Sequence, residues 1–291
     1  MIIGVLGLMG FDYSKHSIPL NEIHDGGPPK DGIPALTDPK FVSVHEAEYL
    51  NPKDRVLGIN INGEAKAYPI KILNWHEIVN DRVGGKEILV SYCPLCGTGM
   101  VFDAHIKGKR ILFGVSGKLY NSDVLMYDKQ AESLWSQIKM EAVTGPMTGR
   151  QLKLLPAELT TWDAWRAKHP DTLALSTRTG YFRDYSKNPY AGYGRSPEIY
   201  FPVNHRDTRL PVKEWVVGVV IDGKAKAYSF ERLRKQVDSV QDVIAGKKIA
   251  VHYDKNGDSA IVEDSNGKVI PSVQAYWFAW RAFYPKTELY E

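Results

Sequence analysis

The feature that most constrains the fold of this chain is an internal repeat. Residues 55–68 (RVLGININGEAKAY) align with residues 215–228 (WVVGVVIDGKAKAY), and eight of the fourteen positions are identical. Further along, GGKEILVSY, which ends at Tyr92, matches AGKKIAVHY, which ends at Tyr253. Because self-similarity of this kind is the signature of a duplicated structural unit, the sequence predicts two related halves.

The two copies differ in length. Residues 156–170 match residues 271–285 at their Pro, Trp, Ala and Arg positions, but the offset falls from 161 to 115. The first copy therefore carries 46 residues that the second lacks, at about residues 104–152. The strings KRILFGVSG, SDVLMYD and SLWSQ within this insert carry the β-branched and aromatic residues that indicate strands.

Each copy has the same local pattern. Asn62-Gly63 in the first copy and Asp222-Gly223 in the second lie between alternating runs, as in a β-hairpin. Apolar spacing predicts a helix over residues 70–80 and a Trp-rich helix over about residues 161–168. We therefore predict a β-rich α+β protein of two related β-hairpin/helix/sheet units. The repeated tryptophans are expected in the core; they are Trp162, Trp165, Trp277 and Trp280.

The repeat divides the chain into four parts. Residues 1–50, punctuated by Pro and Gly, are expected to form an N-terminal arm. Residues 51–175 are expected to form the first unit with its insert, and residues 214–291 the second unit. Between them, residues 176–213 are rich in Tyr, Pro, Gly and Arg without sustained periodicity. They are expected to form a connector that wraps the body and lines a cleft.

Charge and hydropathy exclude two kinds of partner. The chain has 37 Lys and Arg against 34 Asp and Glu and no long basic run, so we expect no nucleic-acid partner. The longest apolar stretch, residues 1–10, is too short to span a bilayer, so we expect a soluble chain without a transmembrane segment. This stretch also lacks the charged start and the cleavage site of an intact secretory signal. A small-molecule substrate or ligand is the partner that remains.

The two cysteines of the chain, Cys93 and Cys96, lie in the string CPLCG. A single pair this close constrains little of the unfolded chain, so the cysteines are expected to act chemically. Two thiolates at this spacing can reach one metal ion, and Gly97 allows the positive φ that closes such a turn. The second copy lacks both cysteines, which places the candidate site in the first half.

His76 is the predicted third ligand. On the expected helix it shares a face with Ile72 and Val79, so its imidazole points inward, where a satisfied core histidine is the alternative. Glu77 and Asp81 are expected to be solvated helix charges. Thiolates and imidazole suit copper, zinc or iron, so one transition-metal ion of open identity is expected.

The insert supplies candidate catalytic residues. Hydroxyls, an amide and a carboxylate between apolar strands would form a polar pocket over the metal, and the same residue types also serve turns. The candidates are Asp123, Asn121, Ser116, Tyr120 and Gln137.

Three strings, LNWHEIVND, YCPLCGT and FGVSGKLYNSDVLMYDKQAESLWSQ, together resemble a bacterial and archaeal family defined as a domain of unknown function (number 3179). The resemblance covers most of residues 34–169, and it implies no particular reaction. Many members carry an export signal or lipid anchor, so it implies a periplasmic or cell-surface setting. Ala131 departs from the family, in which Thr is usual. The family residues that recur here are His76, Cys93, Cys96, Gly97, Ser116, Tyr120, Ser122, Tyr127, Asp128, Trp135 and Gln137.

Several functions follow from this pattern. The leading hypothesis is a metal-binding protein with an open coordination position facing the polar pocket, which catalyses a redox or sulfur-handling reaction. A non-catalytic binding module stapled by a closed metal site is one alternative. Another is a dithiol oxidoreductase, in which Cys93 and Cys96 form a reversible disulfide. A fourth makes one cysteine a nucleophile with His76 as base and Asp103 or Asp123 as orienting group.

Overall fold

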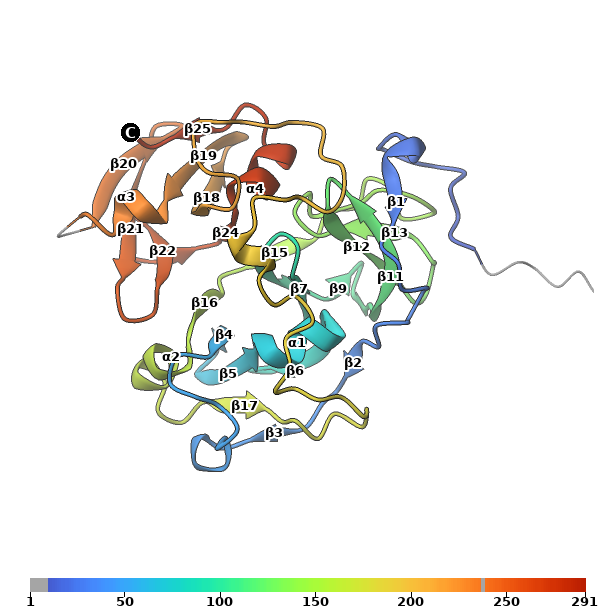
Figure 1. Ribbon diagram of the computed structural model, residues 1–291, viewed down its shortest axis with the longest axis horizontal. Helices are drawn as coiled ribbons and strands as arrows, with labels where there is room; N and C mark the ends of the chain where they lie inside the picture. The colour runs from blue at the N-terminus through green and yellow to red at the C-terminus, as the bar shows by residue number, and fades with distance from the viewer. Residues whose placement is uncertain (1–9, 237–238) are drawn as a thin grey trace, which may run out of the picture.

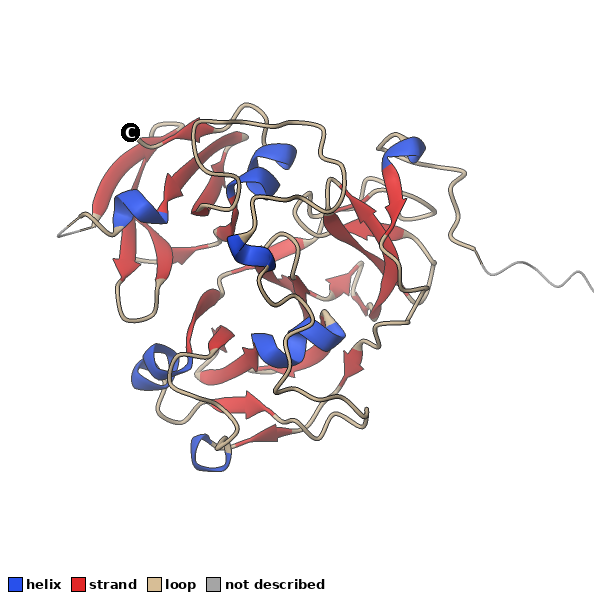
Figure 2. Ribbon diagram, in the orientation of Figure 1, coloured by secondary structure: helices blue, strands red, loops and turns tan. Residues whose placement is uncertain are grey.

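The chain folds into a five-bladed β-propeller (Figures 1 and 2). The structure, a computed structural model, describes residues 10–236 and 239–291. It is mostly β, with 41% strand and 12% helix. The expectation of an α+β protein made of two duplicated units is therefore wrong. The α-helices of the described residues are at most seven residues long, too short to form a layer against a sheet.

Two blades share one strand order and contain the hairpins that align in sequence. Each hairpin pairs antiparallel with the strand before a Trp-containing helix and parallel with the strand after that helix. One blade runs β16 (Glu158–Thr161), β4 (Arg55–Ile61), β5 (Glu64–Pro69), β17 (Leu173–Leu175) and β3 (Phe41–Val42). The other runs β24 (Val273–Tyr276), β18 (Trp215–Ile221), β19 (Lys224–Ser229) and β25 (Glu288–Leu289).

Two more blades follow these hairpins along the chain, and one of them carries the cysteines. In that blade, β2 is parallel to β6 and the other pairs are antiparallel. Its order is β15 (Lys153–Leu155), β8 (Thr98–Asp103), β7 (Lys86–Cys93), β6 (Ile78–Val83) and β2 (Leu36–Thr37). The order of the other blade is β20 (Val240–Ile244), β21 (Lys247–Asp254), β22 (Ser259–Asp264) and β23 (Val269–Ile270).

Residues 104–152, which the sequence comparison marked as an insert, supply most of the fifth blade. Its strand β12 is buried at every position because β11 and β13 flank it. The blade runs β1 (Ile23–Asp25), β11 (Phe113–Tyr120), β12 (Asp123–Asp128), β13 (Leu134–Ser136) and β14 (Glu141–Ala142). A small separate ribbon contains β9 (His105–Ile106) and β10 (Lys109–Arg110).

The helix predicted over residues 70–80 ends early. The helix α1 (Ile70–His76) stops because Glu77 has a φ of 56°, and the strand β6 starts one residue later. Glu77 and Asp81 are both buried, so the expectation that they are solvated helix charges is wrong. The remaining helices are α2 (Trp162–Lys168), α3 (Phe230–Leu233), α4 (Trp277–Phe283), η1 (Leu20–Glu22), η2 (Val44–Glu46) and η3 (Tyr193–Arg195).

The repeated tryptophans are buried in the core, which confirms the sequence-based expectation. Trp165 packs over Gly58, and Trp280 packs over Gly218 in the matching blade. A Cβ atom at Gly58 would lie 2.4 Å from the Trp165 ring, and one at Gly218 would lie 2.5 Å from the Trp280 ring. Glycine is therefore needed at both places because the indole occupies the space of a side chain.

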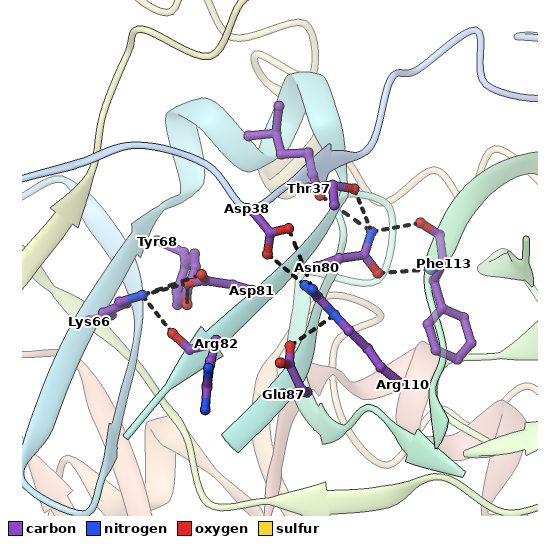
Figure 3. A network of polar contacts seen from close by, with 11 residues as sticks. Thr37, Asp38, Lys66, Tyr68, Asn80, Asp81, Arg82, Glu87, Arg110 and Phe113 are labelled. Atoms are coloured by element: carbon purple, nitrogen blue, oxygen red, sulfur yellow. Dashed lines mark hydrogen bonds and ion pairs between the residues drawn. The ribbon is translucent and has the colours of Figure 1, made fainter. Parts of the chain in front are cut away.

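Polar side chains join neighbouring blades, as Figure 3 shows. The Lys66 ammonium lies 3.1 Å from Asp81 Oδ2, and the Tyr68 hydroxyl donates to the same oxygen at 2.6 Å. These contacts connect β5 with β6 of the next blade. The Asn80 side chain donates to the Phe113 carbonyl at 2.9 Å and accepts from its N–H at 2.8 Å. This pair of hydrogen bonds connects β6 with β11.

The described residues include little of the N-terminal apolar stretch. Of the apolar stretch at residues 1–10, only Gly10 lies within the described residues. Within the described ranges, every helix is too short or too polar to cross a membrane. The connector, residues 176–213, crosses the front of the blades in gold in Figure 1.

Candidate metal centre

The two cysteines lie where β7 turns into β8. Cys93 is the last residue of β7, and Cys96 lies in the turn that follows. Gly97 closes this turn with a φ of 64°, and a Cβ atom there would lie 2.9 Å from the Trp215 ring. Both cysteines are buried with free thiols. The turn therefore holds both sulfur atoms inside the protein, beneath the packed aromatic side chains.

Asp123 joins the cysteines from the insert blade. It starts β12 directly after Asn121-Ser122, whose φ values of 52° and 64° make the tight turn between β11 and β12. One ligand atom from each of Cys93, Cys96 and Asp123 lies within 4.8 Å of the others. The Cys96 thiol also donates to the Ser122 carbonyl at 3.4 Å. Two turns from different blades thus bring three donor groups together.

One metal ion could lie among these three groups. Tetrahedral zinc bonds sulfur at about 2.3 Å and oxygen at about 2.0–2.2 Å, so its ligand atoms lie roughly 3.5 Å apart. Asp123 Oδ2 accepts from the Ile138 N–H at 3.0 Å, whereas the buried Oδ1 has no hydrogen-bond partner among the described residues. A buried, unpaired carboxylate oxygen costs free energy, and coordination to a metal would satisfy it.

Without an ion, burial favours the neutral, protonated forms of the three groups. Burial raises the pKa of Asp123 to about 7 and raises the pKa of both Cys93 and Cys96. Among the described residues, no Lys or Arg forms an ion pair with any of the three. A metal ion would reverse these shifts because it binds the deprotonated forms of thiol and carboxyl.

His76 lies elsewhere in the hydrogen-bond network. It is buried at the end of α1, with Nδ1 2.7 Å from the Pro34 carbonyl and Nε2 2.7 Å from the Tyr185 hydroxyl. Burial lowers the pKa of this imidazole. Both ring nitrogens have protein partners, and His76 is not in the described cluster of donor atoms. The geometry favours Asp123 over His76 as the third ligand.

The other residues predicted for the pocket have different surroundings. The Ser116 hydroxyl donates to the Leu125 carbonyl and accepts from the Lys118 N–H, at the bulge of β11. Asn121 accepts from the Asn204 N–H of the connector at 2.8 Å. These contacts hold the backbone of the insert blade and its connector in place.

Tyr120 and Gln137 also have partners of their own outside the cluster. The Tyr120 ring packs edge-on against Phe283, and Tyr120 is not in the described cluster of donor atoms. The buried Gln137 side chain donates to the Ser91 hydroxyl at 3.0 Å, and its Oε1 has no partner among the described residues. Gln137 directly precedes Ile138, whose backbone N–H donates to Asp123 Oδ2, so Gln137 lies beside the centre.

A cavity of about 240 Å³ adjoins the centre. Cys93 lines it, together with Glu77 and three aromatic residues of the connector, Tyr190, Tyr200 and Phe201. Glu77 is buried, and burial raises its pKa to about 8. Sequence reasoning missed Glu77 because the helical pattern continued through it, and no sequence signal marked the left-handed backbone that turns it inward.

These features define a class of protein, a five-bladed β-propeller with a buried cluster of two thiols and a carboxyl. The family described as "Protein of unknown function (DUF3179)" matches residues 30–287, and the chain belongs to this family. Comparison with curated proteins gave no match. Comparison with solved structures gave none either.

Proposed function

We propose that the protein binds one zinc ion through Cys93, Cys96 and Asp123, and that this centre acts on a small molecule in the adjoining cavity. The observation that carries the proposal is the cluster itself, in which one ligand atom from each of two buried thiols and a buried carboxyl lies within 4.8 Å of the others. A mixed set of soft sulfur and hard oxygen suits zinc better than copper(I), which prefers sulfur alone.

The ligand number supports a catalytic centre rather than a structural one. Structural zinc sites normally have four protein ligands, whereas catalytic sites have three and keep one position for water or substrate. Cys93 belongs both to the cluster and to the cavity wall, so an open position would face the cavity. Bound there, zinc would polarise a substrate oxygen or activate a water molecule. A redox reaction would instead require iron or copper at the same ligands.

Elemental analysis tests the proposal. The full chain, purified without a His-tag, is expected to carry about one zinc per molecule, and Cys93→Ser/Cys96→Ser and Asp123→Asn to lose most of it. Asp222→Asn, which changes an exposed carboxylate on the β18–β19 turn, is the matched control and should keep the metal. Equal, low metal content in all four proteins would refute the proposal.

A dithiol oxidoreductase is the second candidate because the two sulfur atoms are close and free. Thiol exchange, however, needs an accessible thiol whose pKa is lowered, and burial raises the pKa of both cysteines. Mass measurement after alkylation under oxidising and reducing conditions distinguishes the two functions. A reversible loss of two hydrogens in metal-free protein would favour the dithiol function.

A further inference from the structure

The buried carboxyl group of Glu77 lies in the cavity wall, and no cationic side chain of the described residues pairs with it. Its side chain is 7% exposed, and its recorded hydrogen bond comes from the Tyr190 hydroxyl at a long 3.4 Å. Among the described residues, no Lys, Arg or His forms an ion pair with it. Its φ of 56° is uncommon for a residue other than glycine, and such backbone conformations are concentrated at functional sites.

The charge around the cavity would be negative once the proposed centre holds its ion. Two thiolates, one carboxylate and a divalent ion would carry a net charge of about −1. Burial raises the pKa of Glu77 to about 8, so its carboxyl is mostly neutral near pH 7, and a cationic ligand beside it would favour the ionised form. Lys118 also lines the cavity, but its ammonium group pairs with the exposed Asp25 at the surface. Charges interact strongly in such a buried, low-dielectric place, so a ligand that brings a positive charge would be favoured.

The remaining wall is aromatic and aliphatic. Tyr190, Tyr200 and Phe201 line the cavity with Leu119 and Val124. Aromatic rings attract cations through their electron-rich faces, and a desolvated site strengthens this attraction. The cavity volume of about 240 Å³ has room for a small molecule.

We infer that the cavity binds a small organic ammonium ion, with its charged group toward Glu77 and its apolar part against the aromatic wall. This inference rests in part on the proposed function, because the metal centre contributes to the negative charge. It assigns Glu77 to ligand recognition and leaves metal binding to Cys93, Cys96 and Asp123.

Calorimetry with two probes of the same shape tests the inference. Choline carries a quaternary ammonium group, and 3,3-dimethylbutan-1-ol replaces its nitrogen with carbon and has no charge. Zinc-loaded full-length protein is expected to bind choline at least tenfold more tightly than the neutral alcohol. Equal affinity for both probes, or no choline binding at millimolar concentration, would overturn the inference.

A pair of variants tests whether Glu77 causes the preference for choline over the neutral alcohol. Glu77→Gln keeps the shape of the side chain and should weaken choline binding about tenfold or more, with unchanged zinc content. Glu231→Gln, at an exposed site on α3, is the control and should bind choline as the parent does. Undiminished choline binding by Glu77→Gln would show that Glu77 does not recognise the ammonium group.

The zinc content of the same samples separates this inference from the proposed function. If one zinc is bound and choline is not, only the ammonium inference fails. If no zinc is bound, the proposed function fails, and the Glu77→Gln comparison on the metal-free protein still decides the role of Glu77.

Discussion

The Asn121 side chain accepts a hydrogen bond from the Asn204 N–H at 2.8 Å, which fastens the turn before Asp123 to the connector. The two residues are far apart in sequence, and their contact joins the insert blade to the segment that covers the cavity. Asn121 also has a φ of 52°, a conformation that asparagine tolerates better than most residues. The hydrogen bond and the backbone conformation of Asn121 thus fix the turn after which Asp123 begins β12.

Asn121→Gly and Asn121→Ala are expected to destabilise the fold by different amounts. Glycine keeps the positive φ and loses only the hydrogen bond, which costs about 1 kcal/mol. Alanine also has to adopt the left-handed conformation, which adds about 1–2 kcal/mol. Urea unfolding measures the free energy of unfolding of both variants. Equal stability of the two variants would show that the backbone conformation contributes nothing here.

Asp81→Asn is expected to destabilise the protein more than Asp242→Asn does. Asp81 and Lys66 have side chains 7% and 9% exposed, whereas the matching Asp242 and Lys226 are 15% and 16% exposed. Removing one partner of a buried ion pair typically costs about 3–5 kcal/mol because the other charge stays buried. Asp242→Asn, which breaks the more exposed pair, should reduce the free energy of unfolding by less. Similar unfolding midpoints in urea for the two variants would contradict this.

Asp207 is expected to make stability fall at acid pH. Hydrogen bonds from Arg209 and Arg281 hold the pKa of this carboxyl well below its ordinary value. Because the pKa of Asp207 is lower in the folded protein, the ionised carboxylate stabilises the fold at pH values above its unfolded-state pKa of about 3.9. This stabilisation is lost as the pH falls toward the folded-state pKa. Melting temperatures of the parent and Asp207→Asn should therefore differ at pH 6 and converge at strongly acid pH. A constant difference across that range would exclude this linkage.

Metal removal is expected to leave the propeller folded. The cysteine turn and the β11–β12 turn both connect paired antiparallel strands, and the β11–β12 pairing is interrupted only at the bulge between Val115 and Lys118, so the hairpins are expected to form without the ion. Metal in thousandfold excess over its dissociation constant would add roughly 4 kcal/mol of stability. After chelation, circular dichroism should keep its β signal while the melting temperature drops. Loss of the β signal would indicate the closed, structural metal site of a binding module.

Local features of the fold were predictable because neighbouring residues specify them. Asn62-Gly63 and Asp222-Gly223 both adopt positive φ in hairpin turns, and the Thr161 side chain caps α2 close to its predicted start. Gly97 has the left-handed φ expected for the cysteine turn. In each case a few adjacent side chains determine the backbone conformation.

The sequence by itself determined where hairpins, the cysteine turn and the buried tryptophans lie, because short-range sterics and apolar spacing act within a few residues. Only the tertiary structure decided that five sheets close into a propeller and that Asp123, rather than His76, faces the sulfur atoms. It also decided that Glu77 turns into the cavity. These outcomes depend on which blade packs beside which, and contacts between distant segments are not encoded in the periodicity of any single one.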